Sequence, residues 1–193
     1  MMDIKRAWTW LCRCRYSRGF GVQSPWAYRF VRYVINEHYP YYAYDELETS
    51  FSTLSTRQRR LFRLYFRLAN YVQPQVILNI GKITPACEAY LQHGCKRAVV
   101  RTVTMAEEIV RQPFELVRLT CDADYRVFYE TLVPHTDERT LLVIEGINDN
   151  KKARQFWKEV VADERATATF DLYDCGIVFF DRKRIKKHYI INF

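Results

Sequence analysis

The segment Gln75–Gly94 constrains the fold most, because it combines a buried strand, a turn and a helix. Residues 76–80 are apolar apart from one asparagine and rich in β-branched side chains, which is typical of a strand buried on both faces of a parallel sheet. Gly81 marks the turn, a helical pattern follows from Thr84, and Gly94 is the expected C-cap. In α/β proteins such a unit holds nucleotide-like cofactors, usually on a turn with several glycines, whereas here Gly81 stands alone.

Strand and helix patterns alternate through the rest of the chain. Six further strands are predicted at Arg97–Val103, Glu115–Thr120, Thr140–Glu145, Thr167–Leu172, Gly176–Asp181 and Lys187–Phe193. Helices are predicted from Ser24-Pro25, over residues 56–72, after a capping box of Thr104 and Glu107, at about 122–133 and over Asn148–Glu164. This order predicts an α/β fold with a Rossmann-like, mostly parallel sheet and helices on both faces. The last two strands are expected to form a C-terminal antiparallel hairpin around the basic loop Arg182–Lys186.

The length of 193 residues suits one compact unit with a substantial core. We expect residues 1–72 to form an N-terminal helical extension packed on an α/β domain of residues 73–193. No apolar run reaches the roughly 20 residues of a membrane span. Arginines interrupt the basic N-terminus, unlike a secretory signal. Six scattered cysteines fit reduced thiols in a cytoplasmic protein, and no cysteine or histidine spacing indicates a metal site.

The chain carries 30 Lys and Arg against 22 Asp and Glu, a net charge of +8 that favours anionic partners such as nucleic acid, phosphorylated metabolites or a membrane surface. Residues 1–20 form either a cationic amphipathic helix on such a surface or a helix docked through its tryptophans. The patch Tyr39–Tyr44 is either a stacking surface or a packed aromatic corner. Arg57, Arg60 and Arg67 share one stripe of the helix over residues 56–72, and a solvated face is the simplest interpretation.

Several segments together resemble class I S-adenosylmethionine-dependent methyltransferases. They are the strand–turn–helix unit Val76–Gly94, the segment TLLVIEGI at 140–147, the helix with Phe156-Trp157 and the closing segment Phe170–Phe193. A bacterial O-methyltransferase-like branch of that family also begins with a Ser-Pro-aromatic helix and an aromatic corner, like Ser24–Phe30 and Tyr41–Tyr44 here. The resemblance covers roughly residues 20–193 and implies the methyltransferase fold, with S-adenosylmethionine as cofactor.

The resemblance also implies site residues. Those for the cofactor are Asn79, Gly81, Lys82 and Thr84, and those near the methyl acceptor are Glu145 with Asp122 or His135. Three positions depart from the family pattern. Asn79 replaces an acidic residue, Pro85 replaces a further glycine of the turn, and the second strand ends in Val103-Thr104-Met105 without the carboxylate that binds the cofactor ribose.

The interval between Met105 and Glu115 is short, so that the family's third strand and its helix are missing on this alignment. The aspartate that ends the fourth strand in many relatives then corresponds to Thr120. Since the third strand is an edge strand in this fold, its loss leaves a new exposed edge. We expect that edge to support a homodimer or to be covered by the N-terminal helix.

Three functions follow from these features. The first is a methyltransferase-like protein with a degenerate cofactor site that acts as a non-catalytic binding or scaffolding module. The second is an active S-adenosylmethionine-dependent O-methyltransferase. The third is a binder of nucleic acid or an anionic surface that uses Arg57–Arg67, Tyr39–Tyr44 and Arg182–Lys187. Cofactor binding separates the first two, and a steep salt dependence identifies the third.

Overall fold

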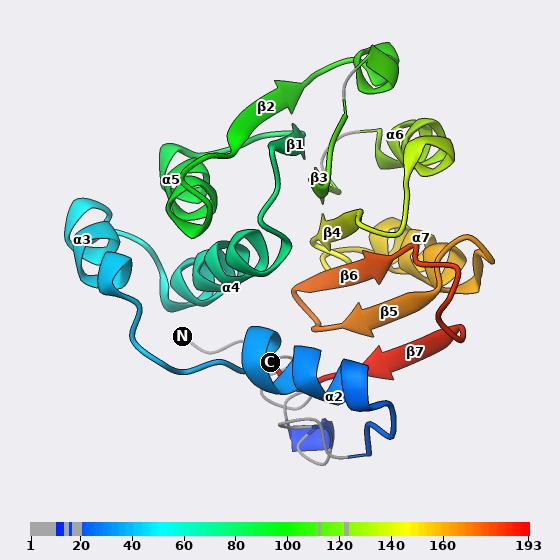
Figure 1. Cartoon of the computed structure of the whole chain (residues 1–193), viewed down its shortest axis with the longest axis horizontal. Coiled ribbons are helices and arrows are strands. Elements are labelled where there is room, and N and C mark those ends of the chain that lie inside the picture. Colours follow the sequence, from blue (N-terminus) through cyan, green and yellow to red (C-terminus); the bar gives the residue numbers. More distant parts are fainter. Residues whose placement is uncertain (1–10, 14–15, 17–20, 112, 122–123) are drawn as a thin grey trace.

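A computed structural model of the chain describes residues 11–13, 16, 21–111, 113–121 and 124–193. Within these residues seven strands form one sheet in the order β2-β1-β3-β4-β6-β5-β7 (Figure 1). The strands are β1 (Val76–Ile80), β2 (Val99–Val103), β3 (Leu116–Thr120), β4 (Leu141–Glu145), β5 (Ala168–Asp171), β6 (Cys175–Phe179) and β7 (Lys187–Ile190). The first four run parallel, and β6 is antiparallel to both β4 and β5. The predicted Rossmann-like sheet with an antiparallel C-terminal hairpin is confirmed.

The hairpin is made by a different pair of strands than expected. The predicted pairing of the last two strands is wrong, because β5 and β6 form the hairpin and β7 runs parallel to β5, with Lys187 beside Ala168. The tight turn between β5 and β6 places Tyr173 at a φ of 71°. β6 already has a neighbour on each side, so the chain passes across β5 and adds its last strand at the free edge.

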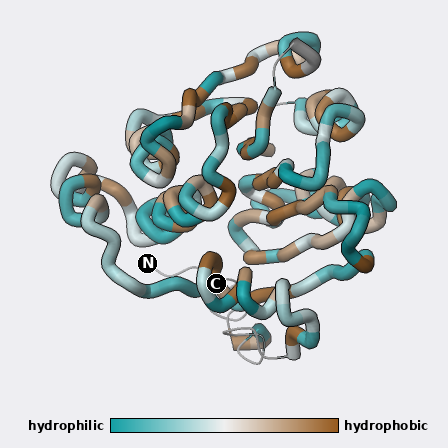
Figure 2. Tube along the Cα trace, viewed as in Figure 1, coloured by the Kyte–Doolittle hydropathy of each residue, from teal (hydrophilic) through white to brown (hydrophobic). Residues whose placement is uncertain are grey.

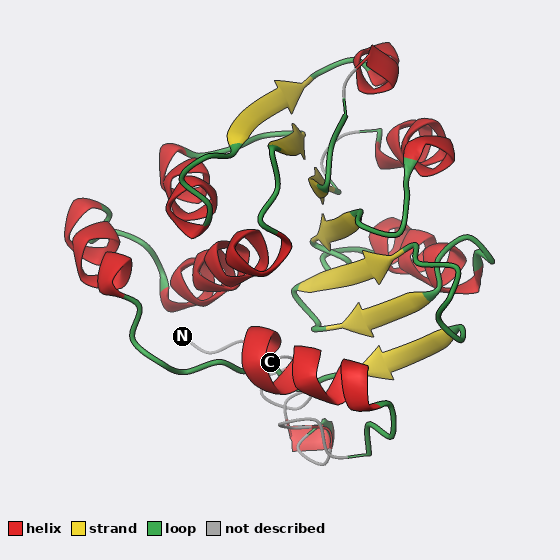
Figure 3. Cartoon of the chain, in the orientation of Figure 1, coloured by secondary structure: helices red, strands yellow, loops and turns green. Residues whose placement is uncertain are grey.

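Helices cover both faces of this sheet (Figure 3). They are α2 (Pro25–Phe30), the π-helix η2 (Val31–Ile35), α3 (Tyr42–Ser50), α4 (Thr56–Val72), α5 (Pro85–Gly94), the 3₁₀ helix η3 (Ala106–Arg111), α6 (Tyr125–Leu132), the 3₁₀ turn η4 (Val133–His135) and α7 (Lys151–Ala162). Ser24 caps α2 and Pro25 occupies its first turn, as predicted. Ser55 and Gln58 form a capping box on α4. No helix within the described ranges is long and apolar enough to cross a membrane.

The core is divided into two layers by the sheet. In β1, Ile77 packs with α2, α4 and α5 on one face, whereas Leu78 and Ile80 pack with α6 and α7 on the other. This alternation follows from the period of two along a strand. Figure 2 shows hydrophobic residues along the strands and on the inner sides of the helices. Polar side chains on the α4 side of the sheet therefore lie between the sheet and its helices, shielded from solvent.

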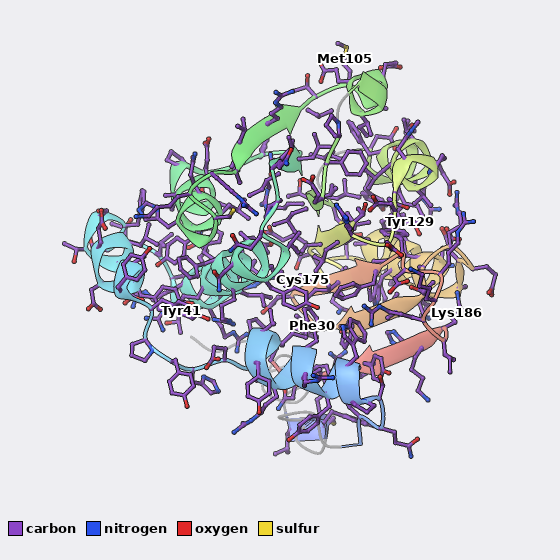
Figure 4. All side chains as sticks on the ribbon, viewed as in Figure 1. Phe30, Tyr41, Met105, Tyr129, Cys175 and Lys186 are labelled. Carbon is purple, nitrogen blue, oxygen red and sulfur yellow. The ribbon has the colours of Figure 1, made fainter. Side chains whose placement is uncertain are left out.

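β2 is an edge strand, as expected from the missing third strand. Four of its five residues are exposed or half-buried, and Met105 just beyond it points away from the sheet (Figure 4). At the other side of the sheet, Arg13 forms an ion pair of 2.7 Å with Asp171 of β5. The described part of the N-terminal segment thus lies away from β2, and its tryptophans Trp8 and Trp10 fall outside the described residues.

Candidate functional site

A cavity of about 730 Å³ opens at the carboxyl ends of β1, β3 and β4. We call it the switch-point cavity, because the chain reverses its crossover direction between β1 and β3, and ligands of open α/β sheets bind at such points. Its sheet side is formed by Lys82, Thr84, Arg118, Thr120, Glu145 and Gly146. The N-cap residues of α4, α5 and α7 also line it, as Ser55, Thr84 and Asn150.

Arg118 fills the sheet side of this cavity. It lies in the middle of β3, directly opposite Asn79 of β1, and is only 5% exposed. Its Nη1 donates to Asn79 Oδ1 at 2.7 Å and to the carbonyl of Lys82 at 3.0 Å. Its Nε and Nη2 donate to Glu145 Oε2 at 2.9 and 2.6 Å. One guanidinium therefore connects β3 with β1, with the end of β4 and with the turn after β1.

Two of the groups bonded to Arg118, Glu145 and Asn79, make further hydrogen bonds. The Tyr65 hydroxyl of α4 donates to Glu145 Oε2 at 2.6 Å, so that this oxygen accepts from two side chains. Asn79 is fully buried, and its Nδ2 donates to the Gly81 carbonyl at 2.9 Å. Gly81 has a φ of 98°, which only glycine adopts without strain. The turn is held by contacts within the chain.

Burial and neighbouring charges shift the pKa values of the groups around Arg118. Burial alone would lower the pKa of Arg118, but nearby Tyr65, Cys87 and Glu145 raise it above its ordinary value. Burial, and then the Glu145 carboxylate, raise the pKa of Tyr65 well above its ordinary value. Burial also raises the pKa of the Cys87 thiol to about 12. Arg118 stays charged, and Tyr65 and Cys87 keep their protons at neutral pH.

The structure gathers five of the six predicted residues that it describes around the turn and cavity. Lys82 and Thr84 line the cavity, with Thr84 as the N-cap of α5, and Glu145 lines it at the end of β4. Asn79 lies beneath it within the network, as above. Gly81 forms the turn itself.

The two remaining acceptor-side candidates are placed differently. His135 ends η4, six residues before β4 begins, so it belongs to the opposite end of the strand whose last residue is Glu145. It is therefore not part of the cavity lining. Asp122 lies outside the described residues.

The end of β2 carries no carboxylate that faces the cavity. The predicted capping box of Thr104 and Glu107 is wrong in its second member, because Glu108 accepts from the backbone N–H groups of Thr104 and Met105 at 3.0 and 3.3 Å. The 3₁₀ geometry of η3 brings the later residue back to the strand end. Met105 itself is 58% exposed.

Sequence reasoning missed Arg118 and Tyr65. Both lie within predicted elements, Arg118 in the strand Glu115–Thr120 and Tyr65 in the helix over residues 56–72. The sequence does contain one indication of this network. Arg118 lies between Val117 and Leu119 in a fully buried strand, and a buried charge requires a partner. The spatial neighbours that supply the partner cannot be found from spacing alone.

The whole structure is similar to solved methyltransferases. A methyltransferase from Podospora anserina bound to SAH matches with a TM-score of 0.52 over 82% of this chain and 96% of that chain, at 13% identity. The MycE methyltransferase of the mycinamycin pathway, with Mg, SAH and mycinamycin VI, matches at 0.54 over 94% of this chain and 62% of that chain, at 13% identity. A methyltransferase from Geobacter sulfurreducens matches at 0.50 over 72% and 86%, at 12% identity.

The fold is that of a methyltransferase. No protein-family model matches the sequence, and no curated protein matches it either. At identities this low the methyltransferase fold is established and the chemistry has to be judged from the residues of the cavity.

The charges of those residues can be compared with the groups that S-adenosylmethionine carries. The methionine end of that cofactor carries a sulfonium, an ammonium and a carboxylate, a net charge of about +1 at neutral pH, and the buried guanidinium of Arg118 in β3 donates to the Lys82 carbonyl in the turn after β1. The carboxylate of Glu145 is already paired with that cation. The adenosine ribose needs an acceptor at the end of β2, where Met105 stands. Among the described residues, no group of three His, Cys, Asp or Glu side chains could hold a metal ion.

Proposed function

We propose that this chain is a methyltransferase-fold protein with a degenerate cofactor site, and that it acts as a non-catalytic binding module. The observation that carries the proposal is the contact of the Arg118 guanidinium with the Lys82 carbonyl in the turn after β1. That turn is where this fold holds the methionine end of its cofactor. A buried positive charge there opposes the sulfonium and the ammonium of this cofactor, whose single carboxylate leaves it with a net positive charge.

The hydrogen-bond pattern supports the same conclusion. Asn79 and Glu145 accept from Arg118, and the Gly81 and Lys82 carbonyls accept from Asn79 and Arg118. The groups that would receive a cofactor are thus bonded within the chain. A ligand would have to break a buried, charge-assisted network before it could bind.

The direct test is calorimetric titration of the purified full chain with S-adenosylmethionine and S-adenosylhomocysteine. We expect no binding heat at millimolar ligand from protein shown to be folded by circular dichroism. The SAH-binding methyltransferase from Podospora anserina, titrated with the same solutions, serves as the positive control. Binding in the micromolar range would overturn the proposal and favour an active methyltransferase instead.

A substitution sharpens this test. Arg118→Met removes the charge and keeps most of the side-chain volume, so we expect S-adenosylmethionine to bind the variant better than the wild type, with a smaller gain for S-adenosylhomocysteine, which lacks the sulfonium charge. Lys158→Met, on the exposed side of α7, is the matched control. Equal affinity of wild type and Arg118→Met at any measurable level would show that Arg118 does not exclude the cofactor.

Two observations favour an active methyltransferase. The switch-point cavity remains open at about 730 Å³, within the range of small-molecule sites, and Gly81 keeps the positive φ that a cofactor turn requires. In that case Glu145 is the one predicted acceptor-side carboxylate that lines the cavity. The calorimetric experiment separates this candidate from the first.

A further inference from the structure

A second cavity, of about 660 Å³, lies beside α4, and we call it the α4 cavity. It is formed by residues 35–40 between η2 and α3, by one face of α4 and by the last residues of the chain. In Figure 1 the segment that connects α2 to α3 runs past α4 on this side of the molecule. The switch-point cavity adjoins the amino end of α4 and shares no lining residue with the α4 cavity.

Arginines dominate the wall of the α4 cavity. Arg59, Arg60, Arg63 and Arg67 all line it from α4, at helical spacings that place them along one side. The lining has two carboxylates, Glu37 and Asp45. From just outside the lining, Glu48 pairs with Arg63 and Asp174 pairs with Arg60 at 3.1 Å.

Arg67 contributes a buried charge. It is 6% exposed, and the interpretation of this stripe as a solvated face is wrong for it. Its Nε and Nη2 donate to the carbonyls of Val34 and Ile35, at 2.7 and 2.9 Å, at the end of the π-helix η2. No carboxylate in the described part of the chain pairs with it. Its charge therefore remains as positive potential at the base of the cavity.

Three N–H donors in the wall have no acceptor. Asn36 Nδ2, Arg59 Nε and Arg63 Nε are each buried and without a hydrogen bond among the described residues. Glu48 pairs with Arg63 Nη2 and lies 4.0 Å from Arg59 Nε, so it neutralises charge there without satisfying either Nε. Buried donors without acceptors are rare in folded proteins and ask for an explanation. The residues that carry these three all line one cavity.

The chemistry of a matching ligand follows from these donors. It is rich in acceptor oxygens and negatively charged, and a phosphate group meets both needs because arginines bind it through parallel hydrogen bonds. Aromatic rings stand beside the donors: Tyr39 is 76% exposed, and the Arg60 guanidinium lies 5.0 Å from the Phe193 ring. An exposed ring next to a phosphate site suits a planar base.

We propose that the α4 cavity binds a small phosphate monoester that carries a planar ring, such as a nucleoside monophosphate. The phosphate accepts from the guanidinium groups of Arg59 and Arg63, whose side chains are 36% and 38% exposed, and from Asn36 beside them, and the ring stacks on Tyr39. This site does not depend on whether the switch-point cavity binds a cofactor.

The test is calorimetric titration of the full chain with four probes: adenosine 5′-monophosphate, ribose 5-phosphate, inorganic phosphate and adenosine. We expect adenosine 5′-monophosphate to bind most tightly, the two other phosphates to bind more weakly, and adenosine to give no heat. Adenosine binding as tight as that of its monophosphate would overturn the proposal, and so would the absence of heat with every phosphate. A monophosphate no tighter than ribose 5-phosphate would overturn the assignment of the ring.

Variants locate the site. Asn36→Asp, which keeps the side-chain shape and adds a negative charge, and Arg63→Gln should each weaken binding of the monophosphate about tenfold or more. Either variant suffices if the other fails to fold, as checked by thermal unfolding. Arg154→Gln, an exposed arginine of α7, should leave the affinity unchanged.

Two further outcomes would overturn the proposal. An equal loss in Arg154→Gln would mean that general surface charge attracts the ligand. A loss in Lys82→Gln, with Asn36→Asp unaffected, would place the phosphate in the switch-point cavity.

Discussion

At the scale of single residues, a charged side chain inside a sheet lowers stability unless its hydrogen bonds are satisfied. Arg118 meets this condition through Asn79, Glu145 and a backbone carbonyl. Its pairing is therefore a structural requirement of the chain, whatever ligand the cavity takes. Removing one partner leaves the other as a buried polar or charged group without a hydrogen bond, which lowers the free energy of unfolding.

We predict that Arg118→Met lowers the free energy of unfolding by about 3 kcal/mol, because it leaves Glu145 without its cation. Glu145→Gln in the same chain should recover part of the loss, since an amide oxygen can still accept from the Tyr65 hydroxyl. Urea unfolding of the two single variants and the double variant measures this as a double-mutant cycle. Losses that simply add would mean that the two side chains are not coupled.

Buried thiols give a second prediction at this scale. Burial raises the pKa of Cys87 to about 12 and raises the pKa of Cys175 as well. Only a thiolate reacts with alkylating agents, and a thiol with a pKa of about 12 is deprotonated in about one molecule in 10,000 at pH 8. Exposed Cys12 should therefore react with iodoacetamide far faster than either of them in the native protein.

Peptide mapping by mass spectrometry checks this prediction. Raising the pH toward 10 should increase the labelling of Cys87, because more thiolate forms as the pH approaches its pKa. Urea-unfolded protein, in which all three thiols are accessible, is the control. Native labelling of Cys87 at the rate of Cys12 would contradict the burial that the structure shows.

At the scale of elements, helices α4 and α5 pack so closely at Gly94 that no room is left for a side chain there. A Cβ at Gly94 would lie 2.2 Å from the Phe66 carbonyl oxygen and 2.9 Å from the Ala69 Cβ, both on α4. The glycine was expected as a C-cap, but it is the last residue of α5, and the cap position belongs to Cys95. Here the glycine allows two helices to approach, which sequence position alone does not distinguish from capping.

We predict that Gly94→Ala lowers the free energy of unfolding by about 2 kcal/mol, since the added methyl group meets backbone that cannot move away easily. Gln92→Ala, at an exposed position of the same helix, should change it by no more than about 0.5 kcal/mol. Chemical denaturation of both variants provides the comparison. A Gly94→Ala protein as stable as the wild type would mean that α4 and α5 can separate without loss.

The elements also show what sequence patterns can and cannot predict. Apolar runs predicted all seven strands, and the boundaries of α4 agree, because burial on both faces leaves a strong signal. The position of β7 was missed because strand pairing depends on which edge is free. The arginines of α4 were assigned to solvent because Arg67 finds its acceptors in η2, more than thirty residues earlier in the chain.

At the scale of the whole molecule, several of the 30 Lys and Arg residues behind the net charge of +8 form ion pairs. Arg57 contacts Asp149 and Asp174, and Arg184 contacts Asp181 within the basic loop. Lys183 of that loop pairs with Glu138. These pairs reduce the positive surface on which the hypothesis of nucleic-acid binding rested.

The exposed edge of the sheet leads to a prediction about assembly. Arg101 is exposed in the middle of β2, so antiparallel pairing of this five-residue strand with a second copy would oppose two arginines. In place of the homodimer expected at this edge from the sequence, we predict a monomer for the wild type and increased self-association for Arg101→Thr, measured by sedimentation velocity. Arg97→Thr, just before the strand, is the control. A wild-type dimer that Arg101→Thr leaves unchanged would contradict this account.

The contact between Arg118 and the turn after β1 makes the order of this turn independent of the concentration of any small molecule. A dissociating ligand stabilises its protein only in proportion to its concentration, and it is lost on dilution or starvation. A guanidinium built into the chain is present once per molecule under every condition. On the proposed function, the order of this turn is the same in a cell rich in the small molecule and in a cell depleted of it, so the protein is insensitive to the metabolite that its architecture evolved around.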